Sequence, residues 1–373
     1  MTVSRRNVLG MLAGASLLPQ LSFAAGEESL NTLAKRKGLR FGNAIANAPD
    51  RFGDPAYRAL MARECGVIVC ENETKWQALE PAKGKLNFAP ADEMFGWAKS
   101  EGMLIRGHTL VWQPEKWLPK WVNEYNFGAK PKVEAERLLR EHITTVCRHF
   151  GKDIYSYDVV NEAIDPATGD YRSNVFTRQL GAVEQLDMSF RVAQAEAPHA
   201  QLVYNDYMRW DKGSTKHRAG VLKLLHALKK KGTPVHALGL QSHIGSWDEF
   251  GTSKNALLEW RKFLDEVSGM GLDLLITEFD VNDRELPGDI AKRDAGVAAL
   301  AKEYLDLTLS YPNMRDFLLW GMADHVSWLQ TWDEAPRKDK LPMRPAPYDA
   351  KLQAKPLRTA IADAFKAMPM RRA

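Results

Sequence analysis

The sequence feature that most constrains the fold is an alternation of short apolar runs with longer helical patterns, which continues from residue 39 almost to the C-terminus. Eight runs are candidate strands: 39–45, 66–70, 103–108, 154–161, 201–205, 235–241, 272–278 and 317–321. Helical patterns lie between and after them at 55–64, 90–101, 132–149, 182–197, 215–230, 254–269, 290–309 and 350–367. Eight strand–helix units are the number in a closed barrel, so the pattern predicts an α/β fold with a single (β/α)8 TIM barrel.

An open, doubly wound sheet is the main structural alternative for this alternation. Such a fold is expected to carry a glycine-rich phosphate-binding turn after an early strand, and neither G-x-G-x-x-G nor G-x-x-x-x-G-K-[ST] occurs here. No linker, low-complexity segment or short-period repeat divides residues 26–373. We therefore expect residues 26–373 to form one domain.

Polar residues follow the carboxyl end of seven predicted strands, at 71–76, 108–109, 161–162, 205–207, 241–243, 278–280 and 320–321. In a (β/α)8 barrel, this end carries the active site. A single polar residue can simply end its strand, but seven such endings in succession indicate a functional site.

Two glutamates stand out because each ends an apolar run: Glu162 after Val159 and Val160, and Glu278 after Leu275 and Ile276. A pair of carboxyl groups across a barrel mouth suits cleavage of a glycosidic bond, in which one donates a proton and the other meets positive charge at the anomeric carbon. These roles need different pKa values. Burial beside tryptophan can raise one pKa, and a hydrogen-bond donor such as His243 can keep the other group ionised.

Aromatic and polar residues near the same strand ends suit a sugar ligand. Indole rings offer apolar faces to sugar C–H groups, and the candidate rings are Trp76, Trp112, Trp320 and Trp328. Sugar hydroxyls need converging donors and acceptors, and the candidates are Asn72, Lys75, His108, Asn161 and Gln241.

Eight motifs along the chain occur in the order of a known family. They are ENETKW (71–76), RGHTLVW (106–112), DVVNE (158–162), YNDY (204–207), GLQSH (239–243), ITEFD (276–280), WGMADHVSW (320–328) and RPAPYD (344–349). Together they resemble glycoside hydrolase family 10, the endo-1,4-β-xylanases, over residues 39–368.

The resemblance implies a retaining (β/α)8 glycoside hydrolase that acts on β-1,4-linked xylan or xylo-oligosaccharides and needs no cofactor and no metal. By position, Glu162 matches the acid/base and Glu278 the nucleophile. Asn161 matches the residue that holds the 2-hydroxyl of the sugar being cleaved, and His243 matches the partner of the nucleophile.

Further substrate-binding positions follow from the same comparison of motifs. The wall of the subsite for the cleaved sugar corresponds to Lys75, His108, Gln241, Trp320 and Trp328, and contacts to the next sugar outward correspond to Glu71 and Asn72. The motifs place three more candidates at the barrel mouth: Trp112, Asn205 and Tyr207.

The third predicted strand is followed by a departure from the family pattern. The family commonly continues VWHxQ, whereas this chain has Gln113, Pro114 and Glu115 after Trp112. We expect the charge of Glu115 to weaken sugar binding, because a carboxylate cannot donate hydrogen bonds to hydroxyls as an amide can. The segment 330–343 predicts a longer loop that shapes the cleft.

Three other functions remain open at this point. The first is another retaining β-glycanase or β-glycosidase, because a fold and a carboxyl pair do not select a sugar. The second is a carbohydrate-binding protein without activity, against which the presence of both glutamates argues. The third is a metal-dependent hydrolase that uses His108, His243 and Glu278, although neither H-x-H nor H-E-x-x-H occurs.

The first 25 residues predict an export signal. Arg5 and Arg6 precede an apolar run at 8–18, and small residues follow at 22–25. The run is too short to span a membrane, and the paired arginines indicate a twin-arginine signal. We therefore expect a protein exported to the periplasm or the medium.

Composition adds limits on partners. The 373 residues carry a net charge of +4, and the basic residues are scattered, so no nucleic-acid partner is indicated. Cys65, Cys70 and Cys147 lie in apolar or helical patterns and are expected to be core thiols. The expected assembly is a monomer without a membrane span.

Overall fold

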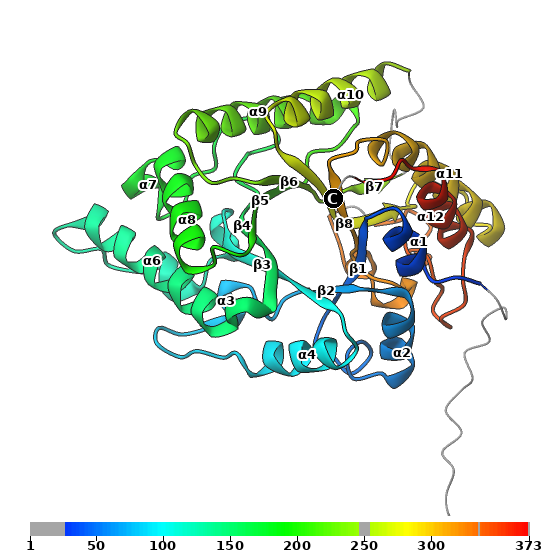
Figure 1. Ribbon diagram of the computed structural model, residues 1–373, viewed down its shortest axis with the longest axis horizontal. Helices are drawn as coiled ribbons and strands as arrows, with labels where there is room; N and C mark the ends of the chain where they lie inside the picture. The colour runs from blue at the N-terminus through cyan, green and yellow to red at the C-terminus, as the bar shows by residue number, and fades with distance from the viewer. Residues whose placement is uncertain (1–26, 246–253, 335, 372–373) are drawn as a thin grey trace, which may run out of the picture.

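A computed structural model describes residues 27–245, 254–334 and 336–371, and it confirms the closed (β/α)8 barrel (Figure 1). The barrel strands are β1 (Arg40–Ile45), β2 (Val67–Cys70), β3 (Leu104–Trp112), β4 (Ile154–Asn161), β5 (Gln201–Asp206), β6 (Ala237–Leu240), β8 (Asp273–Asn282) and β9 (Met314–Leu319). Each pairs in parallel with the next, and β9 pairs with β1, which closes the ring. All eight predicted strands are therefore present.

The helices form an outer layer around the strands (Figure 1). The long ones are α2 (Pro55–Glu64), α4 (Ala89–Ser100), α6 (Pro131–Phe150), α8 (Ala182–Glu196), α9 (Thr215–Lys230), α10 (Lys254–Gly269), α11 (Ile290–Thr308) and α12 (Pro356–Ala367). Shorter helices are α1 (Leu30–Arg36), α3 (Trp76–Leu79), α5 (Lys120–Asn123) and α7 (Thr177–Leu180). Single 3₁₀ turns lie at Glu115–Trp117, Gly151–Asp153, Lys212–Ser214, Asp324–Val326 and Trp328–Gln330.

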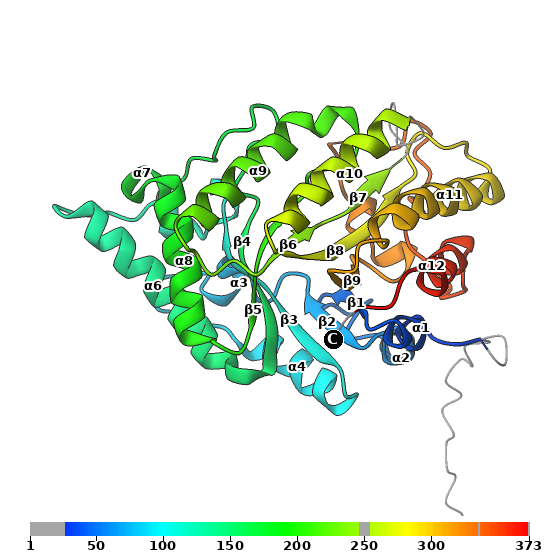
Figure 2. The same cartoon turned by 45° about the horizontal axis from the view of Figure 1, so that its top comes forward.

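Two elements differ from the sequence prediction near the chain ends. The last helix begins at Pro356 rather than at residue 350, because proline fixes the first helical turn and Leu352 has a left-handed φ of 60°. Helix α1 was not predicted; Ser29 caps it by accepting a hydrogen bond from the backbone N–H of Thr32 at 3.1 Å. Helix α1 packs against α12, and Figure 2 shows these first and last helices side by side.

A ninth strand was also not predicted. Strand β7 (His243–Gly245) follows β6 and pairs with residues 280–282 at the end of β8. Ser242, with φ 62°, turns the chain between β6 and β7. This turn brings His243 beside the end of β8.

The barrel interior is partly charged. Alternate strand residues point inward, where two small apolar clusters lie, one around Val69 and Leu318 and one around Val203. Buried Arg106 pairs with Asp158 through Nη1 at 2.6 Å, and His108 Nδ1 lies 2.8 Å from the same carboxyl group. Burial opposes ionisation of Asp158, but Arg106 and His108 lower its pKa.

The larger apolar core lies between the strands and the helices, and the three cysteines belong to it as buried free thiols, as expected. Within the described residues, no helix is both long enough and apolar enough to cross a membrane. The predicted signal at 1–25 lies outside the described part of the chain.

Candidate active site

A cavity of about 640 Å³ opens at the carboxyl ends of the barrel strands. Fifteen site residues were predicted; Trp76 lies elsewhere, and thirteen of the others line the cavity: Glu71, Asn72, Lys75, His108, Trp112, Asn161, Glu162, Tyr207, Gln241, His243, Glu278, Trp320 and Trp328. Asn205, the fourteenth, is fully buried and hydrogen-bonded to lining residues. The structure therefore brings together side chains from strand ends that are far apart in the sequence.

Glu162 reaches the cavity directly after β4 because its own backbone turns there. Its φ of 59° lies in the left-handed region, which a residue with a Cβ adopts only at a cost of about 1–2 kcal/mol. Its backbone N–H bonds to the carbonyl of Asn205 at 2.9 Å. The carboxyl oxygen Oε1 accepts from Gln241 at 3.1 Å and from the Asn161 amide at 3.3 Å.

Burial is the main reason that the pKa of Glu162 is raised above its usual value. The Trp112 indole and the Gln241 amide oppose this rise, and the negative charges of Asp206 and Glu278 add to it. Glu162 is therefore suited to hold a proton at a pH where an ordinary glutamate has lost it.

Glu278 lies within β8, near its end, and has stronger donors. Oε1 accepts from Asn205 at 2.7 Å, and Oε2 lies 3.3 Å from His243 Nε2. Burial opposes ionisation, but the His243 hydrogen bond and the charges of His108 and His243 lower the pKa of Glu278. The two glutamates therefore have pKa values that are shifted in opposite directions, as their predicted roles require.

His243 is the main cause of this difference. Its Nδ1 lies 3.0 Å from Asp280 Oδ2, and that oxygen also accepts from the Trp328 indole at 2.7 Å. Burial alone lowers the pKa of the imidazole, but Asp280 and Glu278 raise it to about 10. His243 is therefore cationic at neutral pH and donates a proton toward each of the two carboxylates.

An aromatic wall surrounds Lys75. Its ammonium group lies 4.5 Å from the ring centre of Trp112 and 5.9 Å from that of Trp320, and it donates to Asn72 Oδ1 at 3.2 Å. Burial lowers the pKa of Lys75, although Glu278 and Glu71 oppose this shift. His108 meets Trp320 edge to face, with 5.2 Å between the ring centres. Charged and aromatic surfaces thus alternate around the cavity.

Trp76 was expected to contact a sugar, and that expectation is wrong. Its ring stacks on His142 at 3.7 Å, and it is buried in the large apolar core. The reason is that Trp76 begins helix α3, which directs its side chain away from the cavity that Lys75 enters.

Glu115 was expected to weaken sugar binding, and this too is wrong. Its carboxylate pairs with Arg178 at 2.7 Å, and Glu115 is not among the residues that line the cavity. The Arg178 hydrogen bond lowers the pKa of Glu115. Gln113 is buried beneath the site, where its Oε1 accepts from Asn174 at 2.7 Å and its amide donates to Gln185 at 3.0 Å.

Several residues that line the cavity were missed from the sequence. They come from the loops after β3, β4, β5 and β9: Lys116, Trp117, Arg172, Arg209, Trp332, Asp333 and Glu334. In a strand, successive side chains point to opposite faces, so their direction can be predicted. A loop has no such alternation. A further tryptophan, Trp117, a few residues after a predicted strand was the sequence signal that could have identified one of them.

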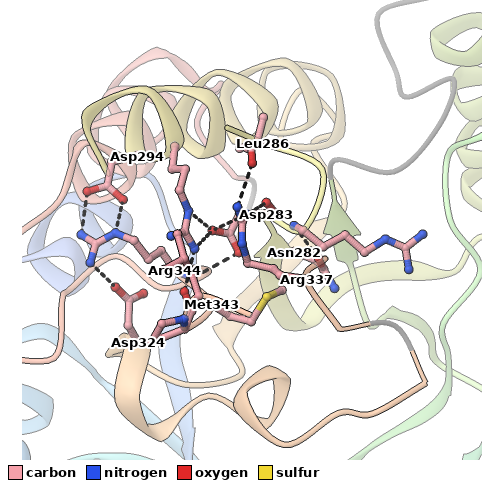
Figure 3. Close-up of polar contacts among 12 residues, drawn as sticks. Asn282, Asp283, Leu286, Asp294, Asp324, Arg337, Met343 and Arg344 are labelled. Atoms are coloured by element: carbon pink, nitrogen blue, oxygen red, sulfur yellow. Dashed lines mark hydrogen bonds and ion pairs between the residues drawn. The ribbon is translucent and has the colours of Figure 1, made fainter. Parts of the chain in front are cut away.

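The loop after β9 forms one wall of the cavity, as predicted for 330–343, and an arginine attaches it to β8 (Figure 3). Buried Arg337 donates to the carbonyls of Asp283 and, at 2.9 Å, Leu286. It also pairs with Asp339 through Nε at 2.9 Å. Asp283 in turn pairs with Arg293 of α11 at 2.5 Å.

Arg344 continues this network on the other side of the loop (Figure 3). Its guanidinium pairs with Asp294 at 2.7 Å and lies 3.6 Å from Asp324. The ammonium of Lys355 binds Asp324 at 2.9 Å, although burial raises the pKa of that carboxyl group to about 6. Ion pairs therefore hold both ends of the wall against the barrel.

A metal-dependent hydrolase would need His108, His243 and Glu278 to bind one metal ion together. Across residues 27–245, 254–334 and 336–371, no three His, Cys, Asp or Glu side chains form a group that could hold a metal ion. Glu278 and His243 instead contact each other and amide or carboxyl groups.

Comparisons with known proteins agree on one family. Residues 29–364 match the model of glycosyl hydrolase family 10. Endo-1,4-beta-xylanase B of Thermotoga neapolitana is 29% identical over 312 residues, which are 83% of this chain and 85% of that protein. The beta-1,4-xylanase of Dictyoglomus thermophilum is 31% identical over 294 residues. The aligned region covers 76% of this chain and 78% of that protein.

Solved structures give the same result. The structure of native xylanase 10B from Thermotoga maritima has a TM-score of 0.80 at 29% identity. The superposition covers 91% of this chain and 98% of the xylanase chain. That of xylanase 10B from Thermotoga petrophila in complex with xylobiose also has a TM-score of 0.80, at 28% identity and the same coverage.

The contacts of Arg337 predict how firmly the loop after β9 is held. Replacing Arg337 with Gln removes charge-assisted hydrogen bonds worth about 1.5–3 kcal/mol each, so the loop should open more often. We expect trypsin to cut after exposed Lys338 or Lys340 at least about tenfold faster. Replacement of exposed Arg140 on α6 serves as the control. An unchanged rate of cleavage would show that Arg337 does not hold the loop.

Proposed function

The chain belongs to glycosyl hydrolase family 10, and from this premise we propose that it is an endo-1,4-β-xylanase that hydrolyses internal β-1,4-xylosidic bonds of xylan with retention of configuration. The observation that carries the proposal is the pair Glu162 and Glu278, which line one cavity and have pKa values shifted in opposite directions. Xylanases at about 30% identity and the match over residues 29–364 support the substrate class.

In the first step, ionised Glu278 attacks the anomeric carbon while Glu162 gives its proton to the leaving oxygen. The bond between the anomeric carbon and that oxygen breaks, and a glycosyl ester forms on Glu278. His243 orients the attacking carboxylate and keeps it ionised. Asn205 fixes the other carboxylate oxygen.

In the second step, Glu162 takes a proton from water, and the water oxygen displaces Glu278 from the sugar. Each step inverts the configuration at the anomeric carbon, so the two steps together retain it. Formation of the ester removes the negative charge of Glu278, which is one of the causes that raise the pKa of Glu162. The pKa of Glu162 therefore falls at the stage when a base is needed.

The remaining predicted residues position the sugar chain. We assign the 2-hydroxyl of the cleaved sugar to Asn161, whose amide lies between Asn205 and Glu162. The walls of this subsite are Lys75, His108, Gln241, Trp320 and Trp328, and Glu71, Asn72, Trp112 and Tyr207 extend the cleft outward. All these groups come from one chain, so the proposed active form is a monomer, which sedimentation velocity can check.

We also propose that residues 1–25 are a twin-arginine export signal and that the rest of the chain is the catalytic domain. The support is Arg5 and Arg6 before a modest apolar run at 8–18. Replacing both arginines with lysine should leave the precursor in the cytoplasm. Unchanged export of that variant would contradict the proposal.

The two glutamates should respond differently to removal. Glu278→Ala should abolish turnover of every substrate, because no group remains to attack the sugar. Glu162→Ala should lower turnover of xylan by about 10²–10⁴-fold but spare the first step on an aryl xylobioside whose leaving group needs no proton. Glu115→Ala, which removes a carboxylate outside the cavity, is the matched control.

The measurements are initial rates on xylan, carboxymethylcellulose and aryl xylobioside, with proton NMR of the first product. We expect activity on xylan and first release of the β-anomer. Equal losses on xylan and aryl xylobioside for Glu162→Ala would refute its role, first release of the α-anomer would refute retention, and faster cleavage of carboxymethylcellulose would refute the substrate.

The pH profile of kcat/KM should be bell-shaped. Activity needs ionised Glu278, so the acidic limb follows its lowered pKa, and it needs protonated Glu162, so the alkaline limb follows its raised pKa. His243→Gln removes the cation that keeps Glu278 ionised. Burial then raises the pKa of Glu278, and the acidic limb should move to higher pH.

His226→Gln is the matched control for that experiment, because His226 is an exposed imidazole on α9 that pairs with Glu266. Its profile should equal that of the unmodified enzyme. If His243→Gln lowers kcat without moving the acidic limb, then His243 does not set the ionisation of Glu278.

A further inference from the structure

A line of buried polar side chains connects helix α9 with the backbone beside Glu162. The N–H of Ala163 donates to the Tyr204 hydroxyl at 3.2 Å, and this hydroxyl donates in turn to Asp206 Oδ2. The other oxygen of Asp206 lies 3.0 Å from Nε2 of His217, on α9. We call Tyr204, Asp206 and His217 the supporting triad. All three are at most 1% exposed, and none is among the residues that line the cavity.

The direction of each hydrogen bond in the supporting triad follows from the groups themselves. A backbone N–H can only donate, so the Tyr204 hydroxyl accepts from Ala163 and gives its own proton to Asp206. Asp206 Oδ1 also accepts the backbone N–H of Tyr207 at 2.8 Å. A carboxylate only accepts, so His217 must carry a proton on Nε2. Among the described residues, His217 is the one donor to Asp206 that comes from outside β5 and the residue after it.

The backbone of Glu162 needs such support because its φ of 59° lies in the left-handed region. A residue with a side chain keeps this conformation only where its surroundings determine it. The peptide group before Glu162 is held by its N–H bond to the Asn205 carbonyl at 2.9 Å. The peptide group after it is held by the bond from Ala163 to Tyr204. Together these two bonds fix the direction in which the Glu162 side chain leaves the backbone.

Close backbone packing sets the position of His217. A Cβ added to Gly220 of α9 would lie 2.4 Å from the carbonyl oxygen of Gly169, in the loop after β4. A Cβ added to Gly169 would lie 2.6 Å from the carbonyl oxygen of Lys216, the residue before His217. The helix and the loop are therefore in direct contact through glycine, and neither can shift toward the other. The imidazole also meets the ring of Tyr207 edge to face, with 4.9 Å between ring centres.

The supporting triad acts on Glu162 and not on Glu278. The carboxyl oxygens of Glu278 are held by Asn205 and His243. Along β5, the side chain of Asn205 points to the opposite face of the strand from those of Tyr204 and Asp206. A change in the triad should therefore disturb proton transfer by Glu162 and leave the attack by Glu278 in place.

We propose that His217 is a positioning residue for the acid/base: through Asp206 and Tyr204 it holds the peptide group after Glu162 and so directs the carboxyl group toward the leaving oxygen. The inference rests on the proposed function and adds to it a residue that touches neither the sugar nor the reacting atoms. Without the His217 donor, the Asp206 carboxylate can turn, and the Tyr204 hydroxyl loses the acceptor that orients it. Glu162 then still holds a proton but presents it poorly.

The test uses variants that separate the hydrogen bond from the ring. His217→Phe keeps an aromatic ring beside Tyr207 but cannot donate to Asp206. His217→Gln places an amide N–H near the position of Nε2 and keeps the donor. Tyr204→Phe removes the link to Ala163 and leaves α9 unchanged. His226→Phe, which replaces an exposed imidazole on the same helix, is the matched control.

Each variant is assayed on xylan and on an aryl xylobioside whose leaving group needs no proton. The value of kcat/KM on the aryl xylobioside reports the first step without help from the acid, whereas kcat/KM on xylan includes proton donation by Glu162. Thermal unfolding of each variant reports on the fold. Should His217→Phe not fold, His217→Asn takes its place, because its shorter amide does not reach Asp206.

We expect His217→Phe and Tyr204→Phe to lower kcat/KM on xylan by about tenfold, the effect of one hydrogen bond, and to change kcat/KM on the aryl xylobioside by less than about twofold. On the aryl substrate, kcat and KM should fall together, because the second step needs Glu162 as base and the glycosyl ester accumulates. His217→Gln should restore most of the activity on xylan. His226→Phe should match the unmodified enzyme on both substrates.

Equal losses of kcat/KM on both substrates in His217→Phe, or no loss on either, would overturn the role of His217. A folded His217→Gln protein that is as impaired as His217→Phe would overturn it as well. Failure of the unmodified enzyme to cleave xylan would instead overturn the proposed function. The comparison is then made with good and poor leaving groups on the sugar that the enzyme does cleave, so the role of His217 is decided in either case.

Discussion

A continuous chain of side-chain amides connects the two glutamates, and the geometry of the site depends on it. Asn205 donates to Glu278 at 2.7 Å and to Asn161 at 3.0 Å, while Gln241 donates to Asn161 at 3.2 Å and to Glu162 at 3.1 Å. These residues come from β4, β5, β8 and the turn after β6, and the chain forms because these strands pair side by side. Buried amides that satisfy one another in this way are rigid, since a displaced member would leave donors without partners. The relative position of the two carboxyl groups therefore depends on several paired strands and not on any single loop.

The hydrogen-bond donors around the two glutamates also explain why their pKa values differ. Glu162 receives only neutral donors, so burial dominates and its pKa is raised. Glu278 receives a neutral donor and also a cationic imidazole, which in turn is held by Asp280. The difference depends on β7, because that strand and the turn at Ser242 bring His243 beside β8. A local turn thus gives two similar strand ends pKa values that are shifted in opposite directions.

The strands and most of the site were predictable because apolar runs of strand length alternate with helices, and polar residues at their carboxyl ends must meet in a closed barrel. Glu162, Glu278 and His243 lie at such strand ends, and the structure places all three in the cavity. Trp76 and Glu115 were misjudged because each lies a few residues beyond a strand, where a short helix or a loop ion pair decides which way the side chain points. Arg172 and Arg209 were missed for the same reason. Arg172, for example, contacts the Tyr207 hydroxyl from a different loop, and the sequence around Arg172 gives no sign of that contact.

The departure from the family pattern after β3 has a single physical explanation. Gln113 turns inward and is held by Asn174 and Gln185, while Glu115 turns outward and neutralises Arg178. Neither Gln113 nor Glu115 lines the cavity. The residues of this loop that do so include Lys116 and Trp117. The carboxylate of Glu115 is thereby used outside the cleft, and it does not cancel the charge of Arg172 inside it. The charge of Glu115 is thus balanced by Arg178 outside the cavity, and the hydrogen bonds that connect Glu162 and Glu278 do not involve this loop.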